Sequence, residues 1–352
     1  MRAIGLLRTV AALAAAAIIS LNAPDATAQD RRVRMQMQSN FASTLALLGP
    51  NAQYTVDQVR RLSNGSIDMR FFEPGALVPP SQAFDAVASG AIDAAWATPG
   101  FWTGKNMAFA IYSTVPFGPG IPEFLAWMRE GGGEKLMQEL YGRFGIHSLM
   151  CHMIPPEASG WFRREIRTLD DLRGLKMRFF GLGAVVMQKL GVATQLLQAG
   201  EIFQALQLGT IDATEFSMPV MDLSLGFHQV ARFYYFPGWH QQATVGDLII
   251  NKARWDSLTP HQRAAIEAAC DQTVLRGISL GESLQPGALR EIQSRGVQLM
   301  TWGPEFLAAF ERAWNETVEE QVRANPDFRR GWESLSTFRA QYAIWRERGY
   351  LR

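Results

Sequence analysis

The chain has 352 residues, of which 47% are hydrophobic, and its 34 basic and 33 acidic residues give a net charge of +1. This near-neutral balance, with no basic run interleaved with aromatic residues, argues against nucleic acid or an anionic membrane surface as the main partner. The length predicts two domains, and the apolar content is ordinary for a packed globular protein.

Residues 1–28 have the pattern of a secretory signal peptide. Two arginines precede an apolar run over residues 10–21, and Ala-Thr-Ala at 26–28 follows as a small-residue cleavage site. The run is too short to span a bilayer, which takes about 20 residues. An amphipathic transit peptide is the alternative, but the run is apolar all round. We therefore expect export to the periplasm with cleavage near Ala28, which leaves equal numbers of acidic and basic residues.

The mature chain alternates predicted strands with predicted helices. Residues 33–38 alternate polar and apolar side chains as a half-buried strand does, residues 44–62 fit a helix, and a Ser-Asn-Gly turn leads into a second alternating stretch at 67–72. The same criteria predict a helix up to residue 144, strands near 146–153, 160–164, 175–180 and 193–197, a helix over 183–190, strands within 233–251, and helices that begin at Pro260 and Pro304.

Two segments of the chain repeat one another at a constant offset. Residues 81–94 and 200–213 each predict a helix, a glycine stop at Gly90 or Gly209, and a short buried strand that begins with Ile-Asp-Ala. Two copies are too few for a solenoid. The pattern therefore predicts an α/β fold of two lobes, each a mostly parallel sheet flanked by helices, with a ligand cleft between them.

The expected domain boundaries follow from this order of elements. Lobe 1 is predicted over residues 29–152 with a return segment at about 243–285, and lobe 2 over residues 153–242 with C-terminal helices at about 286–352. Cys151 and Cys270 are the only cysteines, and both a disulfide, which an oxidising compartment would allow, and a buried free pair remain open.

The last predicted helix carries an aromatic stripe on one face. Packing onto its own chain is the favoured interpretation, and a homodimer contact is the alternative, because such a stripe must be covered by something. The stripe consists of Trp332, Leu335, Phe338, Tyr342 and Trp345.

Motifs of catalysis are weak in this chain. Gly-Ile-Ser-Leu-Gly at 277–281 matches a hydrolase nucleophile elbow by letter, but it lies in a helical stretch and the last histidine, His261, precedes it. Gly181 and Gly183 lack the third glycine of a dinucleotide fingerprint, and the five histidines show no zinc spacing. We therefore expect no enzyme activity and no catalytic cofactor.

Arg178 and Glu215 are the strongest candidates for a binding site. Arg178 lies in the first strand of the second lobe, which should end at the cleft, and arginine binds carboxylates through two parallel hydrogen bonds. Pairing with an acid is the alternative. Glu215 and Phe216 follow the second Ile-Asp-Ala at the places that Trp96 and Ala97 take after the first. They should face the cleft, where Glu215 either pairs with an arginine or binds a cation.

Four motifs in order, at 160–166, 174–178, 209–215 and 235–239, resemble the extracytoplasmic solute receptors of TRAP transporters, the DctP-type family. The chain is most similar to the branch that binds 2-oxo acids and related monocarboxylates, and the resemblance spans essentially the whole mature chain. It implies a two-lobed, type II-like periplasmic binding protein that closes on a small organic acid. It also implies delivery of this acid to a membrane permease driven by a sodium gradient.

The resemblance further implies which residues bind. The family arginine that holds the substrate carboxylate is matched by Arg178. The cation site of the 2-oxo-acid branch, a Gln, a Glu-Trp pair and a distal Glu, is matched by Glu157, Glu215-Phe216 and Gln241, so the Gln and the distal Glu have exchanged types. Two carboxylates and one amide oxygen suit a hard cation, Na⁺ or Ca²⁺.

Further ligand contacts are implied on both lobes, with core packing as the alternative for the aromatic residues. They are Asn40, Phe41, Phe101 and Trp102 on lobe 1, and Trp239 and His240 on lobe 2. The sequence thus predicts a periplasmic receptor for a 2-oxo or 2-hydroxy monocarboxylate. A ligand sensor that signals to a partner would use the same cleft, and an exported hydrolase is the least favoured alternative.

Overall fold

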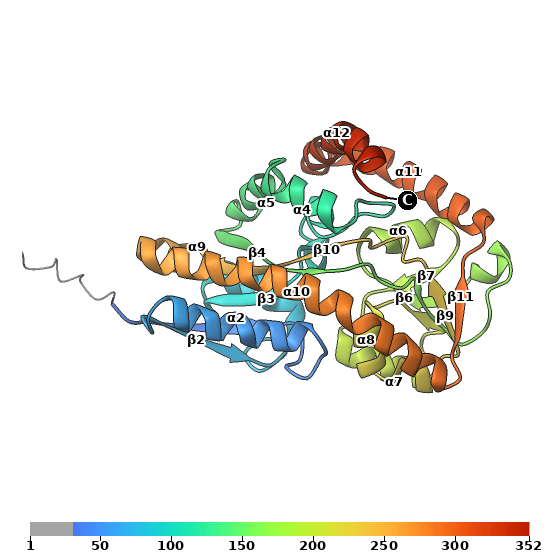
Figure 1. Cartoon of the computed structure of the whole chain (residues 1–352), viewed down its shortest axis with the longest axis horizontal. Coiled ribbons are helices and arrows are strands. Elements are labelled where there is room, and N and C mark those ends of the chain that lie inside the picture. Colours follow the sequence, from blue (N-terminus) through green and yellow to red (C-terminus); the bar gives the residue numbers. More distant parts are fainter. Residues whose placement is uncertain (1–30, 352) are drawn as a thin grey trace, which may run out of the picture. The chain divides into compact units, whose positions relative to one another are not determined.

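The structure, a computed structural model, describes residues 31–351, so the predicted signal peptide at 1–28 lies outside the described residues. Residues from Val33 onward form one compact unit, which is coloured from blue to red in Figure 1. It contains two sheets with helices packed around them, which confirms the two-lobed α/β prediction. Among residues 31–351, no helix is long and apolar enough to cross a membrane.

The first sheet has five strands in the order β2-β1-β3-β10-β4. β1 pairs in parallel with β2 and β3, whereas β10 is antiparallel to both β3 and β4, so β10 alone runs against the rest. The strands are β1 (Val33–Ser39), β2 (Ile67–Phe72), β3 (Ala94–Ala97), β4 (Ile146–Ile154) and β10 (Thr244–Asn251), and the helices nearby in the chain are α2 (Leu48–Leu62), α3 (Ala83–Ser89), α4 (Ile121–Arg129), α5 (Gly133–Gly142) and α9 (Lys252–Asp256).

The second sheet has six strands in the order β11-β9-β5-β8-β6-β7. Here β5 alone runs against its neighbours, because it is antiparallel to β8 and β9 while the other pairs are parallel. The strands are β5 (Gly160–Phe162), β6 (Lys176–Arg178), β7 (Ala193–Gln195), β8 (Ala213–Thr214), β9 (Phe233–Phe236) and β11 (Gln298–Thr301), with helices α6 (Gly181–Lys189), α7 (Ala199–Gln207) and α8 (Pro219–Ser224).

The repeated segments form the same unit in each sheet. α3 ends at Gly90, whose φ is 80°, and leads to β3, while α7 is followed by Gly209, whose φ is 73°, and leads to β8. Glycine adopts this left-handed conformation without the steric cost that a Cβ would add. The predicted order of helix, glycine stop and short buried strand is therefore confirmed in both copies.

The chain passes between the sheets three times. Residues 155–159 join β4 to β5, residues 237–243 join β9 to β10, and α10 (Pro260–Ser294) leads from the first sheet to β11. α10 packs against α2 and β4 and also against α8, and Figure 1 shows it in orange beside both sheets. A disulfide between Cys151 and Cys270 joins β4 to α10, which settles the open question about the two cysteines.

The segment that matches a nucleophile elbow by letter lies inside α10. The Ser279 hydroxyl donates to the Leu275 carbonyl oxygen at 2.9 Å, one helical turn earlier. The helix begins as predicted, because Pro260 occupies the first turn and Thr259 caps it by accepting from the Gln262 N–H at 3.2 Å. The sharp turn between strand and helix that an elbow requires is therefore absent from this segment.

The aromatic stripe of the C-terminal helix is only partly covered. After α11 (Pro304–Ala324), α12 (Pro326–Arg348) buries Leu335 completely and packs Trp332 on Trp314, with ring centres 5.5 Å apart. Toward its end, however, Ile344 is 66% exposed and Trp345 is 56% exposed. The first half of the stripe thus packs onto its own chain, as the favoured interpretation predicted.

Candidate ligand-binding site

A small cavity lies between segments of the two sheets. It is lined by Phe41, Leu48, Thr98, Phe101, Ile154, Glu157, Arg178, Phe180, Phe216, Ser217, Gln241 and Thr244.

Arg178 is held at the end of β6 by the neighbouring strand. Parallel pairing of β6 with β8 places Arg178 beside Thr214, the residue before Glu215. Arg178 Nη1 donates to the Glu215 carbonyl oxygen at 2.7 Å and to Glu215 Oε1 at 2.6 Å, and Nε donates to the Leu197 carbonyl oxygen at 3.3 Å. The guanidinium also lies 5.3 Å from the centre of the Phe216 ring. The arginine is only 2% exposed and fixed in one orientation.

Glu215 uses one carboxylate oxygen and leaves the other without a partner. Oε1 accepts from Arg178 and from the Phe180 N–H, the latter at 2.6 Å. Oε2 has no hydrogen-bond partner and lies 3.5 Å from Nε2 of His240. Burial by itself would raise the pKa of Glu215, but the charge of Arg178 and the contact with His240 outweigh it and lower this pKa. Glu215 is therefore an anion with one free oxygen.

Glu157 likewise has one carboxylate oxygen with a hydrogen-bond partner and one without. Its Oε1 accepts from the Ser217 hydroxyl at 3.0 Å, while Oε2 has no hydrogen-bond partner. Burial and the nearby charge of Glu215 raise the pKa of Glu157 well above its usual value. The Glu157 N–H donates to the Gln241 carbonyl oxygen at 3.1 Å, so the two crossing segments are attached to one another beside the cavity.

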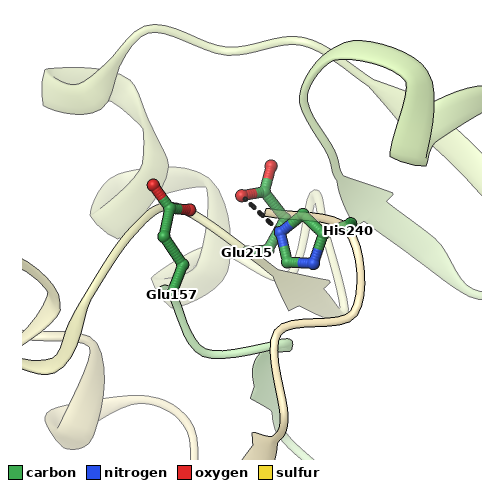
Figure 2. A group of neighbouring side chains, drawn as sticks. All are labelled: Glu157, Glu215 and His240. Carbon is green, nitrogen blue, oxygen red and sulfur yellow. Dashed lines mark ion pairs between the residues drawn. The ribbon is translucent and has the colours of Figure 1, made fainter. Parts of the chain in front are cut away.

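Free donor atoms from these residues converge. Glu157, Glu215 and His240 each offer an atom that lies within 4.8 Å of the others (Figure 2). The Gln241 side-chain oxygen, on the neighbouring residue, also has no partner, and all four residues are buried. Leaving buried polar atoms unpaired costs free energy. A metal cation would satisfy these oxygens, so the residues present fit a bound cation.

The rest of the cavity wall is aromatic. The Phe101 ring lies 5.9 Å from that of Phe41 and meets the Phe180 ring edge-on at 5.3 Å. Phe101 belongs to the 3₁₀ helix Pro99–Trp102, which follows β3, whereas Phe180 follows β6. This ring pair therefore joins the two lobes across the cavity.

The structure brings most of the predicted site residues to one place. Glu157, Arg178, Phe216 and Gln241 line the cavity together with Phe41 and Phe101, and Glu215 is bonded to Arg178.

Of the predicted residues that do not line this cavity, three are held by other contacts. The Asn40 amide donates to the Pro80 carbonyl oxygen at 3.4 Å. Trp102 packs on Phe84 with ring centres 5.4 Å apart, and Trp239 packs on Phe310 at 4.8 Å.

Sequence reasoning missed six lining residues, Leu48, Thr98, Ile154, Phe180, Ser217 and Thr244. Ser217 directly follows Phe216, and Phe180 is two positions beyond Arg178. Proximity to the end of a cleft-facing strand was a usable signal for this pair. Thr98 follows β3 and Ile154 ends β4, so the same signal applies to them, whereas Leu48 begins α2 and Thr244 begins β10.

Two lobes, crossing segments and a small cavity with a buried arginine define a two-lobed solute-binding protein. The chain belongs to the bacterial extracellular solute-binding protein family 7, whose family model matches residues 39–325. Members of this family are receptors for solutes.

Individual relatives support the assignment over most of the chain. A monocarboxylate 2-oxoacid-binding periplasmic protein of Nostoc sp. is 31% identical, covering 89% of this chain and 86% of that protein. A TRAP transporter solute-binding protein from Bordetella bronchiseptica, a mixed-occupancy dimer with copurified calcium and picolinate, is 32% identical with a TM-score of 0.88, covering 90% and 94% of the two chains. One from Pseudoalteromonas atlantica with sodium and pyruvate is 29% identical with a TM-score of 0.86, covering 90% and 96%.

Proposed function

We propose that this chain is the periplasmic receptor of a TRAP-type transporter and binds a small 2-oxo or 2-hydroxy monocarboxylate, together with a cation, in the cavity at Arg178. The observation that carries the proposal is that the buried charged groups use only some of their polar atoms in hydrogen bonds within the protein. The protein's hydrogen bonds to Arg178 use Nε and Nη1, which leaves the two N–H groups of Nη2 for a ligand carboxylate.

The cation would complete the other half of the site. Glu157, Glu215 and Gln241 would hold it through their free oxygens, and a 2-oxo or 2-hydroxy oxygen of the ligand would add a further donor. The aromatic wall at Phe41 and Phe101 would contact the ligand's carbon chain. The Bordetella relative holds calcium with picolinate and the Pseudoalteromonas relative holds sodium with pyruvate, which supports the pairing of a cation with a small carboxylate here.

Binding would act by favouring the closed arrangement of the lobes. Because the cavity takes residues from both sheets and from both short crossing segments, a ligand there contacts both lobes at once. The closed population rises by the ligand's differential affinity for that state. The closed receptor would then deliver its solute to the membrane permease, and we infer no catalytic step.

Export and self-association complete the proposal. We infer that residues 1–28 direct export and that cleavage falls near Ala28, which agrees with a family of extracellular proteins. The exposed Ile344 and Trp345 at the end of α12 favour contact with a second copy of this chain, and the Bordetella relative is a dimer.

A thermal-shift screen of organic acids tests the function. The mature protein, freed of metal by a chelator, is heated with each acid alone and with Na⁺ or Ca²⁺. We expect 2-oxo and 2-hydroxy monocarboxylates to raise Tm by about 5 °C or more when a cation is present, since a ligand at 100 times its Kd adds about 2.7 kcal/mol. Sugars serve as the negative control. If no organic acid raises Tm with any cation, the proposed function is wrong.

The exchanged residue types give a matched control for the cation. Glu157→Gln alone should weaken cation dependence by removing one charged donor, whereas Glu157→Gln combined with Gln241→Glu restores two carboxylates and one amide oxygen and should recover most of it. Equal cation dependence in all three proteins would remove Glu157 and Gln241 from the cation site.

A further inference from the structure

We propose that His240 is a ligand of the cation, and that this site therefore binds a borderline divalent ion such as Zn²⁺ in preference to Na⁺ or Ca²⁺. The proposal rests on the proposed function, because it concerns the cation that accompanies the acid. It departs from the Na⁺ or Ca²⁺ expectation, which considered oxygen donors alone.

The position of the imidazole supports this role. His240 lies in the second crossing segment and is 1% exposed, and neither ring nitrogen has a hydrogen-bond partner. Apolar rings hold it in place: Phe179 meets it edge-on at 4.9 Å, and Trp239 lies 5.5 Å away. Figure 2 shows the imidazole beside the Glu215 carboxylate, where Nε2 is 3.5 Å from Oε2.

This separation suits two ligands of one small ion. Zn²⁺ binds histidine nitrogen and carboxylate oxygen at about 2.0–2.2 Å, so two ligands at a tetrahedral angle lie roughly 3.4 Å apart. At 3.5 Å, the contact is too long for a strong hydrogen bond. One ligand atom each from Glu157, Glu215 and His240 lies within 4.8 Å of the others, so the three residues surround one position.

The donor types distinguish between ions. Ca²⁺ takes oxygen ligands, whereas imidazole suits zinc, copper, iron and nickel. A site with one imidazole nitrogen, two carboxylate oxygens and an amide oxygen therefore combines nitrogen and oxygen donors. A 2-oxo acid would add oxygen donors without changing this character.

The charge of the cavity favours a divalent ion over Na⁺. A bound cation takes Glu157 as the ionised carboxylate, and Glu157, Glu215 and a bound monocarboxylate then carry three negative charges, against one positive charge on Arg178. All of these groups are buried, where an uncompensated charge is costly. A divalent ion balances the remainder, whereas Na⁺ leaves one negative charge.

Calorimetric titration tests the preference. The mature protein, without an affinity tag and in the presence of saturating pyruvate, is titrated with Zn²⁺, Ca²⁺ and Na⁺. We expect Zn²⁺ to bind at least tenfold more tightly than Ca²⁺. His240→Phe keeps a ring against Phe179 and should weaken Zn²⁺ binding by tenfold or more while changing Ca²⁺ binding less than threefold. His228→Gln, at a histidine that does not line the cavity, should change neither.

A spectroscopic measurement identifies the ligand directly. Cu²⁺ bound in place of Zn²⁺ should show nitrogen hyperfine coupling in its electron paramagnetic resonance spectrum, and His240→Phe, or His240→Gln if the first variant does not fold, should abolish it. The proposal is overturned if Ca²⁺ or Na⁺ binds as tightly as Zn²⁺, if His240→Phe weakens all cations equally, or if the coupling persists. Acid binding would survive each of these outcomes, whereas absence of acid binding with every cation would refute the receptor function itself.

Discussion

The two walls of the cavity grow from copies of one structural unit but differ in charge. In each lobe a helix, a left-handed glycine and a short strand fix the position of the next residues. The first copy places Trp96 in β3, where it is fully buried and stacks on His152 with ring centres 4.7 Å apart. The second copy places Glu215 at the corresponding position, bonded to Arg178. The repeated backbone therefore sets the position of this side chain in each lobe. The residue type then determines whether the side chain packs in the core or forms an ion pair beside the cavity.

Two fully buried acids, one from each lobe, differ in how their charge is compensated. Glu215 is compensated by an ion pair, which lowers its pKa. Asp247 in β10 is equally buried, but its only side-chain partner is the Tyr141 hydroxyl, which donates to Oδ2. Burial raises the pKa of Asp247 to about 7. Glu215 thus keeps its charge, whereas burial favours the protonated form of Asp247.

Removing the ion pair between Arg178 and Glu215 should have the largest effect of the changes considered, on both stability and ligand binding. Arg178→Ala leaves Glu215 buried and uncompensated, and breaking a buried pair by deleting one partner costs about 3–5 kcal/mol. We also expect it to abolish the rise in Tm caused by organic acids. Chemical unfolding and a thermal-shift assay measure the two effects. Undiminished stabilisation by the ligand would remove Arg178 from the carboxylate-binding role, and Arg178→Lys tests whether charge without the planar fork suffices.

The protonated acid of the first lobe should make stability depend on pH. The folded pKa of Asp247, about 7, lies above its unfolded value of 3.8. Its contribution to stability is therefore complete below the unfolded value and is lost as pH rises toward 7, at up to about 1.4 kcal/mol per pH unit. Asp247→Asn, which keeps an oxygen acceptor for Tyr141, should show a flatter profile between pH 4.5 and 7. Urea unfolding across this range measures it, and parallel profiles would contradict the protonated state.

Replacing Gly100, which lies between the two walls of the cavity, should have the smallest effect. A Cβ on Gly100 would come 2.2 Å from Phe180 Cζ, in the opposite lobe. Gly100→Ala should force the rings apart and lower organic-acid affinity by about three- to tenfold, while the free energy of unfolding without ligand changes by less than about 1 kcal/mol. Gly104→Ala is the control, because nothing lies within 4 Å of its added Cβ. Equal affinities of the two variants would show that this approach of the lobes does not contribute to binding.

The sequence by itself determined the scaffold and the central pair of the site. Local periodicity and glycine stops identified both copies of the repeated unit, because helix and strand patterns and left-handed glycines are encoded by neighbouring residues. The same reasoning placed Arg178 and Glu215 at strand ends facing the cleft. Parallel strands that end at a common edge bring such residues together, so their pairing could be anticipated from topology.

Only the tertiary structure decided what each side chain does at the cleft. Asn40 and Phe41 are adjacent in the chain, yet only Phe41 lines this cavity, because packing rather than position in the sequence selects the exposed face. His240 has no other metal-ligating residue at a recognisable spacing in the sequence, because Glu157 and Glu215, its neighbours in space, come from distant segments. These residues come together because the two crossing segments are hydrogen-bonded to one another beside β8. Contacts of this kind depend on long-range chain closure, which local patterns do not encode.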